Sequence, residues 1–494
     1  MPAPNALQRR VEKLTSILDV AKELAAAREL DPLLRRIAEA ACKVADADRC
    51  TLYVLDKEKN ELWSKVARGA SAVIRIPLGA GLAGTVAQTG DIINIADAYA
   101  DPRFNATIDK ATGYRTQTVL CVPMRDAQGD IVGVLQVLNK HDGHFTGEDE
   151  ELLVALGGQA AGAIENAILH DEINRLFEGF VSASVVAIES RDPTTAGHSD
   201  RVARLTVALA EAVQRDGRGA HQGLRFSDKN LKELRYASLL HDFGKVGVRE
   251  PVLVKANKLY PEQLAVLEAR FAVARKDHQL QSALRKLERL SQSPLSAATD
   301  GEENRALEAA LRELDALWEF VVACNRPAVL EQRGFERLKE VAGISFLDAK
   351  GQQQPLLASA EVALLSIPKG SLSEAERLEI ESHVTHTFRF LSLIPWTREL
   401  QRVPSIAYAH HERADGRGYP LAISGAEIPV QSKMMAIADV YDALTASDRP
   451  YKRAVPHALA LDIIGSESKS GKLDAGLFEV FTAARIPKQV LGHS

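Results

Sequence analysis

Apolar residues recur at three- and four-residue steps near the start of the chain, which is the spacing of one face of a helix. The repeat predicts an amphipathic helix over residues 6–47 and is carried by Leu14, Ile17, Leu18, Ala21 and Leu24. From residue 50 to residue 140 the pattern changes to short β-rich runs separated by turn residues. The predicted strands are Thr51–Leu55, Leu62–Ala67, Ile92–Ile95, Val119–Met124 and Ile131–Leu138. A helix, short antiparallel strands and a further helix predict a small α+β domain within residues 1–170.

A second long helical pattern follows directly after the strands. No proline occurs between Glu148 and Glu189, and apolar residues keep the helical period, so one continuous helix is predicted over 148–189. At about 1.5 Å per residue this helix would extend over tens of ångströms and connect two domains. Its partly heptad spacing favours a parallel homodimer, and burial of the helix on its own domain is the alternative.

The remaining residues, 181–494, carry a predominantly helical pattern. Within them, residues 262–345 contain two runs of leucine at helical spacing, separated by turn residues at 291–304. This arrangement predicts a helical hairpin. Because the segments on either side of the hairpin are alike in sequence, we interpret it as an insertion in a helical domain over 181–460. A helical extension follows over 461–494.

Composition narrows the class of protein. The 494 residues carry 61 Lys+Arg against 66 Asp+Glu, a net charge of -5, which gives no reason to expect nucleic-acid or membrane-surface binding. The four cysteines lie far apart, as expected of reduced, mostly buried thiols. Charged residues interrupt the long apolar runs, and no apolar signal core follows the N-terminus. A soluble, cytoplasmic protein is therefore expected.

Candidate chemistry is concentrated in a few histidines and aspartates. Two adjacent histidines, His410 and His411, point about 100° apart if helical, so they cannot both face one core stripe. They can converge on a metal near the end of their helix. Further imidazoles and carboxylates that could join them are His198, His241, Asp242, His383 and Asp439. Each alone is more commonly a capped or hydrogen-bonded polar group, but together they could surround a two-metal site of Fe, Mn, Zn or Co.

The first domain resembles a GAF sensory domain over residues 20–170. The segments that carry the resemblance are Gly81–Gly90, Asn94–Asp97, Asp101–Asn105 and Thr112–Thr116. The residues that follow are similar to the signature of cyclic-nucleotide-binding GAF domains: Asn139, Lys140, Phe145, Asp149 and Glu150. The resemblance implies an antiparallel sheet flanked by helices, with a cyclic nucleotide as ligand. The alternative is that Lys140 and Asp149 form a structural ion pair where a strand meets the helix starting at Thr146.

The histidines and aspartates resemble those of the HD phosphohydrolase superfamily over residues 181–262 and 365–460. His383, His410-His411-Glu412 and the Gly418-Tyr419-Pro420 loop are similar to its HD-GYP branch, whose members hydrolyse cyclic di-GMP. The resemblance implies an all-α domain with two metal ions, Fe or Mn foremost and Zn, Co or Ni as alternatives. It implies that the first ion is held by His198, His241, Asp242 and Asp439. The second would be held by Asp242, His383, His410 and His411.

The number of metals rests on one position. Members of this branch that hold a third metal place a glutamate four residues before the first histidine, where this chain has Thr194. Two metals are therefore expected. Glu189 lies nearby but out of register, and we interpret it as a residue of the helix surface.

The resemblance also implies an activity. It places His241, Asp242 and Lys245 at the reacting centre. Substrate contacts would come from Lys245, Arg449, Lys452 and Tyr419, with the tyrosine ring offered to a guanine or to a partner protein. The expected function is a GAF-regulated cyclic di-GMP phosphodiesterase that produces pGpG or GMP. Two alternatives stay open: a protein that binds cyclic di-GMP and signals without hydrolysis, and a hydrolase of another cyclic dinucleotide. The insertion could cover the site or present a docking surface, which favours the first alternative, whereas the intact ligand set opposes it.

Overall fold

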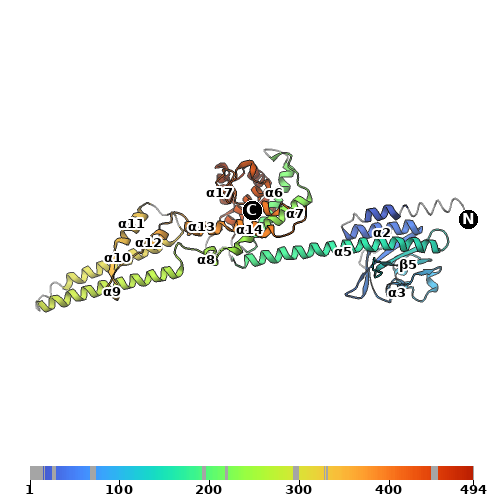
Figure 1. The fold of residues 1–494 in the computed structure, drawn as a ribbon, viewed down its shortest axis with the longest axis horizontal. Helices are drawn as coiled ribbons and strands as arrows, with labels where there is room; N and C mark the ends of the chain where they lie inside the picture. Colours follow the sequence, from blue (N-terminus) through green and yellow to red (C-terminus); the bar gives the residue numbers. More distant parts are fainter. Residues whose placement is uncertain are drawn as a thin grey trace. The chain divides into compact units, whose positions relative to one another are not determined.

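The computed structural model describes residues 15, 17–24, 29–66, 74–191, 196–216, 221–292, 300–327, 329, 332–446 and 454–492. Contacts divide the chain into two compact units, Met1–Gly179 and Phe180–Ser494. The first is a mixed α/β unit and the second is almost entirely helical (Figure 1). The predicted fold class is confirmed: an α+β domain joined by a long helix to a helical domain with a hairpin insertion.

The N-terminal unit is built on a six-stranded antiparallel sheet in the order β3-β2-β1-β6-β5-β4. Its strands are β1 (Ala47–Asp56), β2 (Glu61–Val66), β3 (Ile74–Pro77), β4 (Ile93–Ile95), β5 (Val119–Arg125) and β6 (Ile131–Lys140). The long central strands β1 and β6 pair with Cys50 opposite Val137. Five strands correspond to predicted runs, whereas β3 was not predicted because a four-residue edge strand is too short to show a period.

Helices cover both faces of this sheet. They are α2 (Leu30–Ala45), α3 (Gly81–Thr89), η1 (Ala98–Ala100), α4 (Thr107–Thr112) and α5 (Gly147–Glu189). The helix α2 and the first half of α5 lie on one face and α3 on the other (Figure 1). Because successive side chains of a strand alternate between faces, Leu120 and Val122 of β5 pack with α2 and α5, while Val119 and Cys121 pack with α3. This explains why β5 is apolar at consecutive positions.

The predicted single helix over 6–47 is wrong. The backbone of Glu29 is extended and lies between the helical residues 17–24 and α2, and α2 ends before Asp46, which is left-handed. The apolar period continues across the break because Leu24 packs into the same core as α2. Leu14 and the other residues before residue 15 lie outside the described residues.

The helix α5 is continuous, as predicted. Its first turn is capped by Asp149, whose carboxylate accepts hydrogen bonds from the backbone N–H and the hydroxyl of Thr146. Leu153, Leu156 and Ile164 in its first half pack against the sheet. Among the described helices, α5 alone is long and apolar enough to suit a membrane span, and this packing accounts for part of its apolar character.

The helices of the C-terminal unit outside the insertion are α6 (His198–Asp216), α7 (Asp228–Leu239), η4 (Phe243–Gly247), α8 (Glu250–Leu253), α13 (Glu374–Glu381), α14 (His383–Ser392), α15 (Val403–Tyr408), η6 (Gly425–Glu427), α16 (Val430–Thr445), α17 (His457–Lys469), α18 (Ala475–Ala483) and α19 (Ile486–Leu491). The central helix is α16, whose Met434, Ile437 and Tyr441 are fully buried. Between η4 and α14 the backbones approach so closely that a Cβ on Gly244 would lie 1.9 Å from the carbonyl oxygen of His383. This approach brings the segment after α7 against the start of α14.

The insertion contains the two predicted helices and more. These helices are α9 (Pro261–Gln292) and α10 (Asp300–Asn325), and their connection falls in 293–299, outside the described residues. They are followed by α11 (Gln332–Gly343), β7 (Ser345–Leu347), β8 (Gln353–Pro355) and α12 (Ser359–Leu365). A core of its own holds these elements together and includes Leu267, Phe271, Val321, Leu338 and Leu356. The insertion therefore folds as a small subdomain, larger than the hairpin that the leucine pattern predicts.

Candidate metal centre

Five histidines lie at the ends of helices that meet in the C-terminal unit. His198 is the first residue of α6 and His383 is the first residue of α14. His241 follows α7, and His410 and His411 follow α15. All but the half-buried His411 are buried. The structure thus gathers imidazoles from four helices that lie far apart in the sequence.

The protonation of three of these rings is set by local backbone. In each, Nδ1 lies within hydrogen-bond distance of the carbonyl oxygen three residues earlier: His241 to Ser238 (2.7 Å), His383 to Ile380 (2.6 Å) and His410 to Ala407 (2.6 Å). Carbonyls near the end of a helix lack intrahelical partners, so they are available as acceptors. A carbonyl cannot donate, so Nδ1 carries the proton and the neutral ring keeps a lone pair on Nε2.

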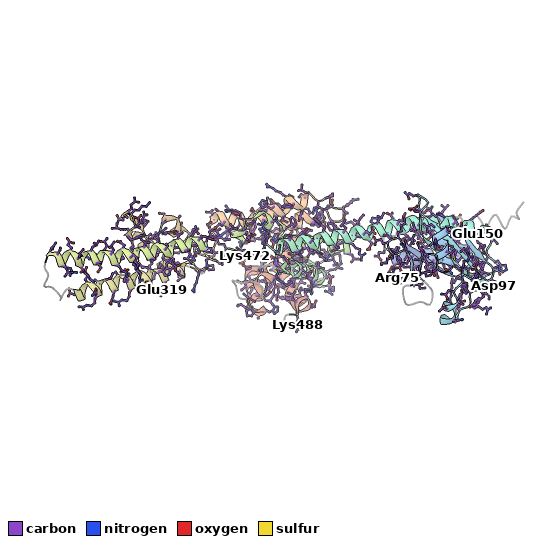
Figure 2. The ribbon with its side chains drawn as sticks, turned by 90° about the horizontal axis from the view of Figure 1, so that it is seen from below. Arg75, Asp97, Glu150, Glu319, Lys472 and Lys488 are labelled. Carbon is purple, nitrogen blue, oxygen red and sulfur yellow. The ribbon has the colours of Figure 1, made fainter. Side chains whose placement is uncertain are left out.

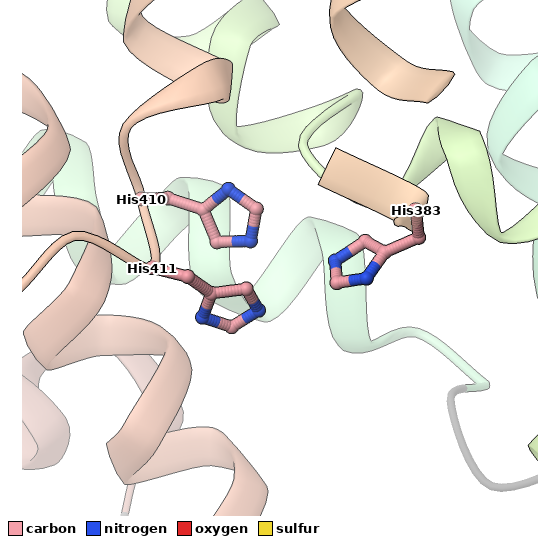
Figure 3. A group of neighbouring side chains, drawn as sticks. All are labelled: His383, His410 and His411. Atoms are coloured by element: carbon pink, nitrogen blue, oxygen red, sulfur yellow. The ribbon is translucent and has the colours of Figure 1, made fainter. Parts of the chain in front are cut away.

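Those Nε2 atoms are buried and converge. Among the described residues, the Nε2 atoms of His241, His383 and His410 make no hydrogen bond, which is costly for a buried polar atom. Figure 3 shows the imidazoles of His383, His410 and His411 facing one another, and one nitrogen from each lies within 4.8 Å of the others. A second group with the same spacing contains His198, His241 and Asp439. Orphaned nitrogens that converge beside a carboxylate fit divalent cations.

Asp242 lies between the two groups. Its Oδ1 is 3.2 Å from Nε2 of His383, whereas its Oδ2 is 3.4 Å from Nε2 of His241 and 3.8 Å from that of His198. The Nζ atom of Lys245 lies 2.9 Å from the same Oδ2. One carboxylate oxygen of Asp242 thus lies toward His383 and the other toward His241 and His198, and Asp242 forms a third candidate group with His241 and His410.

His241, His410, His411 and Asp242 are held in the protonation states that metals need, and His198 is the exception. Burial lowers the pKa of His411 to about 4 and also lowers the pKa values of His241 and His410. Burial alone would raise the pKa of Asp242, but the charge of Lys245 and the neighbouring imidazoles hold it well below its usual value. Neutral imidazoles and an ionised carboxylate are the forms that bind a divalent ion.

Asp442 is a functional candidate that the sequence analysis missed. It is buried on α16, and its carboxylate accepts hydrogen bonds from Arg201 at 2.6 and 3.0 Å and lies 2.8 Å from Nδ1 of His198. Burial lowers the pKa of His198, but the hydrogen bonds to Asp439 and Asp442 outweigh this effect and raise it to about 9. Asp442 thus turns Nε2 of His198 toward Asp439, 3.2 Å away. The sequence offered one signal for this role. Asp439 and Asp442 are three residues apart in α16, a spacing that places both carboxylates on one face of that helix.

The interpretation of Glu189 as a surface residue was wrong. Its carboxylate oxygens accept hydrogen bonds from the backbone N–H groups of Gly197 and Ser199, at 2.8 and 3.1 Å. Glu189 therefore caps the helix that begins with His198 and neutralises its positive N-terminal end. Thr194 lies outside the described residues, so the expectation of two metals rather than three stays a prediction.

Two of the four predicted substrate contacts lie at the centre. Lys245 contacts Asp242, and the ring of Tyr419 packs on that of His411 with centroids 4.8 Å apart. Arg449 and Lys452 lie outside the described residues, and their roles stay predictions.

The signature residues of the N-terminal unit form a structural network. Lys140 pairs with Asp149 at 2.9 Å, which is the contact expected from the structural alternative. The side-chain amide of Asn94 donates to the carbonyl oxygen of Phe145 and to the carboxylate of Glu150, which is labelled in Figure 2. These contacts tie the sheet to the start of α5.

A cavity of about 430 Å³ lies elsewhere in the same unit. Its lining includes the following basic and aromatic side chains: Arg49, Arg75, Arg103, Tyr53, Phe104 and Tyr114. The five signature residues do not line it, and Asn139 meets its wall only by donating a hydrogen bond to the hydroxyl of Tyr114 at 2.9 Å. A basic and aromatic lining suits an anionic ligand that carries a ring.

Comparison with known families assigns both units. The sequence matches the profile of the GAF domain over residues 29–164 and that of the HD domain over residues 358–477. The chain combines a GAF domain with an HD domain. The HD match begins after most of the insertion, so His198, His241 and Asp242 precede it and join the centre only through the fold.

Curated relatives share part of this chain. It is 34% identical over 200 residues to "Probable 3',5'-cyclic phosphodiesterase pde-5" of Caenorhabditis elegans, covering 37% of this chain and 27% of that protein. It is 36% identical over 166 residues to the dual 3',5'-cyclic-AMP and -GMP phosphodiesterase 11A of Takifugu rubripes, covering 31% and 18%. The chain thus spans about a quarter or less of the length of these relatives. Among solved structures, the GAF domain of a phosphoenolpyruvate-protein phosphotransferase from Coxiella burnetii is 24% identical with a TM-score of 0.30, covering 33% of this chain and 98% of that one.

Proposed function

We propose that the HD domain binds two divalent metal ions and hydrolyses the phosphodiester bonds of cyclic di-GMP. The observation that supports this proposal is the presence of two adjacent ligand groups with Asp242 between them. A group of three histidines beside a mixed histidine and aspartate group favours Fe or Mn, with Zn, Co or Ni as alternatives.

Bound divalent ions would neutralise the phosphate and activate water for attack on phosphorus. The side chains of this domain would supply the remaining functions. Asp242 would balance part of the charge of the two ions, and Lys245, which contacts Asp242, would donate to a phosphate oxygen. Arg449 and Lys452 are proposed to hold the second phosphate. One hydrolytic step yields pGpG and two yield GMP.

Cyclic AMP or cyclic GMP is the second candidate substrate. The relatives named above as 3',5'-cyclic phosphodiesterases favour it, because they share sequence with this chain. The match covers only a part of both proteins, so cyclic di-GMP stays the first candidate, on the resemblance of the His410-His411 pair and the Gly418-Tyr419-Pro420 loop to the HD-GYP branch.

The test is an assay of full-length protein loaded with Mn²⁺ or Fe²⁺ under reducing conditions. Cyclic di-GMP, cyclic di-AMP, cyclic AMP and cyclic GMP are supplied separately, and the products are resolved by chromatography. We expect pGpG and then GMP from cyclic di-GMP, and none from the His410→Ala/His411→Ala variant. Turnover of cyclic mononucleotides alone would favour the second candidate. Tight binding of cyclic di-GMP without turnover would identify a signalling protein that does not hydrolyse it.

We further propose that the GAF cavity binds a cyclic nucleotide that regulates the HD domain. The cavity offers guanidinium groups to a cyclic phosphate and aromatic rings to a base. Cyclic AMP or cyclic GMP at millimolar concentration should raise the temperature of the GAF unfolding transition in the full chain. The shift should shrink in Arg103→Ala, and its absence in the parent protein would exclude this ligand class.

A parallel homodimer along α5 is the assembly that we propose. Leu169, Ile173 and Leu176 are exposed and follow the alternating four- and three-residue steps of a coiled-coil seam. Sedimentation velocity should give twice the 53.7 kDa mass of one chain, and a monomer at micromolar concentration would contradict the proposal. We propose a cytoplasmic location, with neither nucleic acid nor a membrane as partner.

A further inference from the structure

His411 differs from the other four histidines in how its ring is held. The rings of His241, His383 and His410 each place Nδ1 against a backbone carbonyl, and that of His198 places it against Asp442. Within the described part of the chain, the imidazole of His411 makes no hydrogen bond of this kind. A metal ligand without such a partner has no contact of that type to fix its orientation.

The ring of Tyr419 packs against this imidazole. Its centroid lies 4.8 Å from that of His411, and the two planes are inclined by 39°. The ring of His410 also lies close to that of His411, with centroids 4.0 Å apart. His411 thus packs against two rings, that of its neighbour in sequence and that of a residue eight positions later.

The loop that carries Tyr419 is folded back onto the two histidines by its backbone. The N–H of Tyr419 donates to the carbonyl oxygen of His411 at 3.3 Å, and the N–H of Leu421 donates to the buried carboxylate of Glu412 at 2.6 Å. Gly418 lies so close to the preceding segment of the loop that a Cβ on this glycine would be 2.3 Å from the backbone nitrogen of Arg413. These contacts hold the backbone of Tyr419 beside His411.

We propose that Tyr419 is a positioning residue for the metal centre: its ring orients His411, in place of the hydrogen bond that orients each of the other four histidines. This inference deepens the proposed function and rests on its metal centre. In this role the ring of Tyr419 contacts His411 rather than a guanine base. The role requires the aromatic face of the tyrosine but not its hydroxyl.

The test compares the metal affinity of full-length variants and uses no substrate. Metal-free protein is titrated with Co²⁺, bound ions are counted, and affinity is measured by competition with a chelator and by visible absorption of the bound ion. Tyr419→Leu should bind its weaker Co²⁺ ion about 10- to 100-fold less tightly than the parent, the range found when a residue orienting a ligand is removed. Tyr419→Phe should stay within about twofold of the parent. Arg417→Ala, an exposed change in the same loop, is the matched control and should also match the parent.

Several results would overturn the proposal. One is an unchanged Co²⁺ affinity in Tyr419→Leu, above all if its KM for cyclic di-GMP rises, because the ring would then serve the substrate. Another is an equal loss in Tyr419→Phe, because the hydroxyl would then be responsible. If Tyr419→Leu fails to fold by circular dichroism while Tyr419→Phe folds and binds normally, a smaller change, Tyr419→Met, must show the same loss. Failure of the parent protein to bind two Co²⁺ ions would instead refute the proposed metal centre itself.

Discussion

Replacing Asp242 by asparagine is expected to reduce hydrolysis by at least about 10³-fold and to lower the bound metal below two ions per chain. The carboxylate faces both ligand groups, with Oδ1 toward His383 and Oδ2 toward His241. An amide removes the negative charge that two cations require and turns a donor nitrogen toward one of them. Because the pKa of Asp242 is held well below its usual value, the parent protein keeps this charge throughout the physiological pH range. Metal content by mass spectrometry and the product assay measure the two effects.

The matched control is Asp200→Asn, on the exposed face of α6 two residues after His198. It removes the same charge from the same domain and should leave both metal content and rate unchanged. Two bound ions and a normal rate in Asp242→Asn would show that the carboxylate does not bridge the groups. Normal metal content with a lost rate would restrict its role to the reaction.

The second large effect is expected from Gly244→Ala, which should destabilise the HD domain by about 3 kcal/mol or more. The added Cβ would lie 1.9 Å from the carbonyl oxygen of His383 and 2.4 Å from the backbone nitrogen of Thr387. It would also lie 2.8 Å from the hydroxyl oxygen of Thr387, which accepts a hydrogen bond from the N–H of Gly244 and donates one to the carbonyl of His241. Two of these atoms belong to packed backbone, and the hydroxyl oxygen is hydrogen-bonded to backbone on both sides. None of them can move aside as the end of a flexible side chain would. The midpoint of thermal unfolding of the HD domain should fall by several degrees.

Gly343→Ala is the comparison for that measurement. Gly343 lies in the last turn of α11, and a Cβ there meets no described atom within 4 Å. The free energy of unfolding of the Gly343→Ala variant should therefore change by less than about 1 kcal/mol, because only helix propensity and chain entropy differ. If Gly244→Ala unfolded at the parent temperature, the close approach of η4 and α14 would be disproved.

The accuracy of the sequence predictions depended on whether a pattern was local. The long helix α5 and the strand β5 were predicted because each carries enough apolar residues to show its period or its composition. The helix over 6–47 was predicted wrongly because Leu24 packs into the same core as α2, so the period runs through a break at Glu29. The strands of the insertion after α10 were not predicted, since β7 and β8 have only three residues each.

The candidate site shows the same division. His410 and His411 could be chosen from the sequence because adjacent histidines do not fit one apolar face. Asp442 and Glu189 could not, because their roles depend on hydrogen bonds to His198 and to the start of α6 that no local pattern displays. The ion pair between Lys140 and Asp149 was expected from the sequence as the structural alternative, whereas the contacts of Phe145 and Glu150 with Asn94 became visible only in the fold.

Residue types and spacings alone therefore specified an α+β domain, a long helix, a helical domain and a set of metal-binding side chains, because these follow from local periodicity and from the chemistry of imidazole and carboxylate. The tertiary structure decided which of those side chains share a site, which ring nitrogen each histidine presents, and that Asp242 faces both groups. The physical reason is that burial, ring tautomer and shared ligands depend on neighbours up to about 240 residues away, as His198 and Asp442 illustrate.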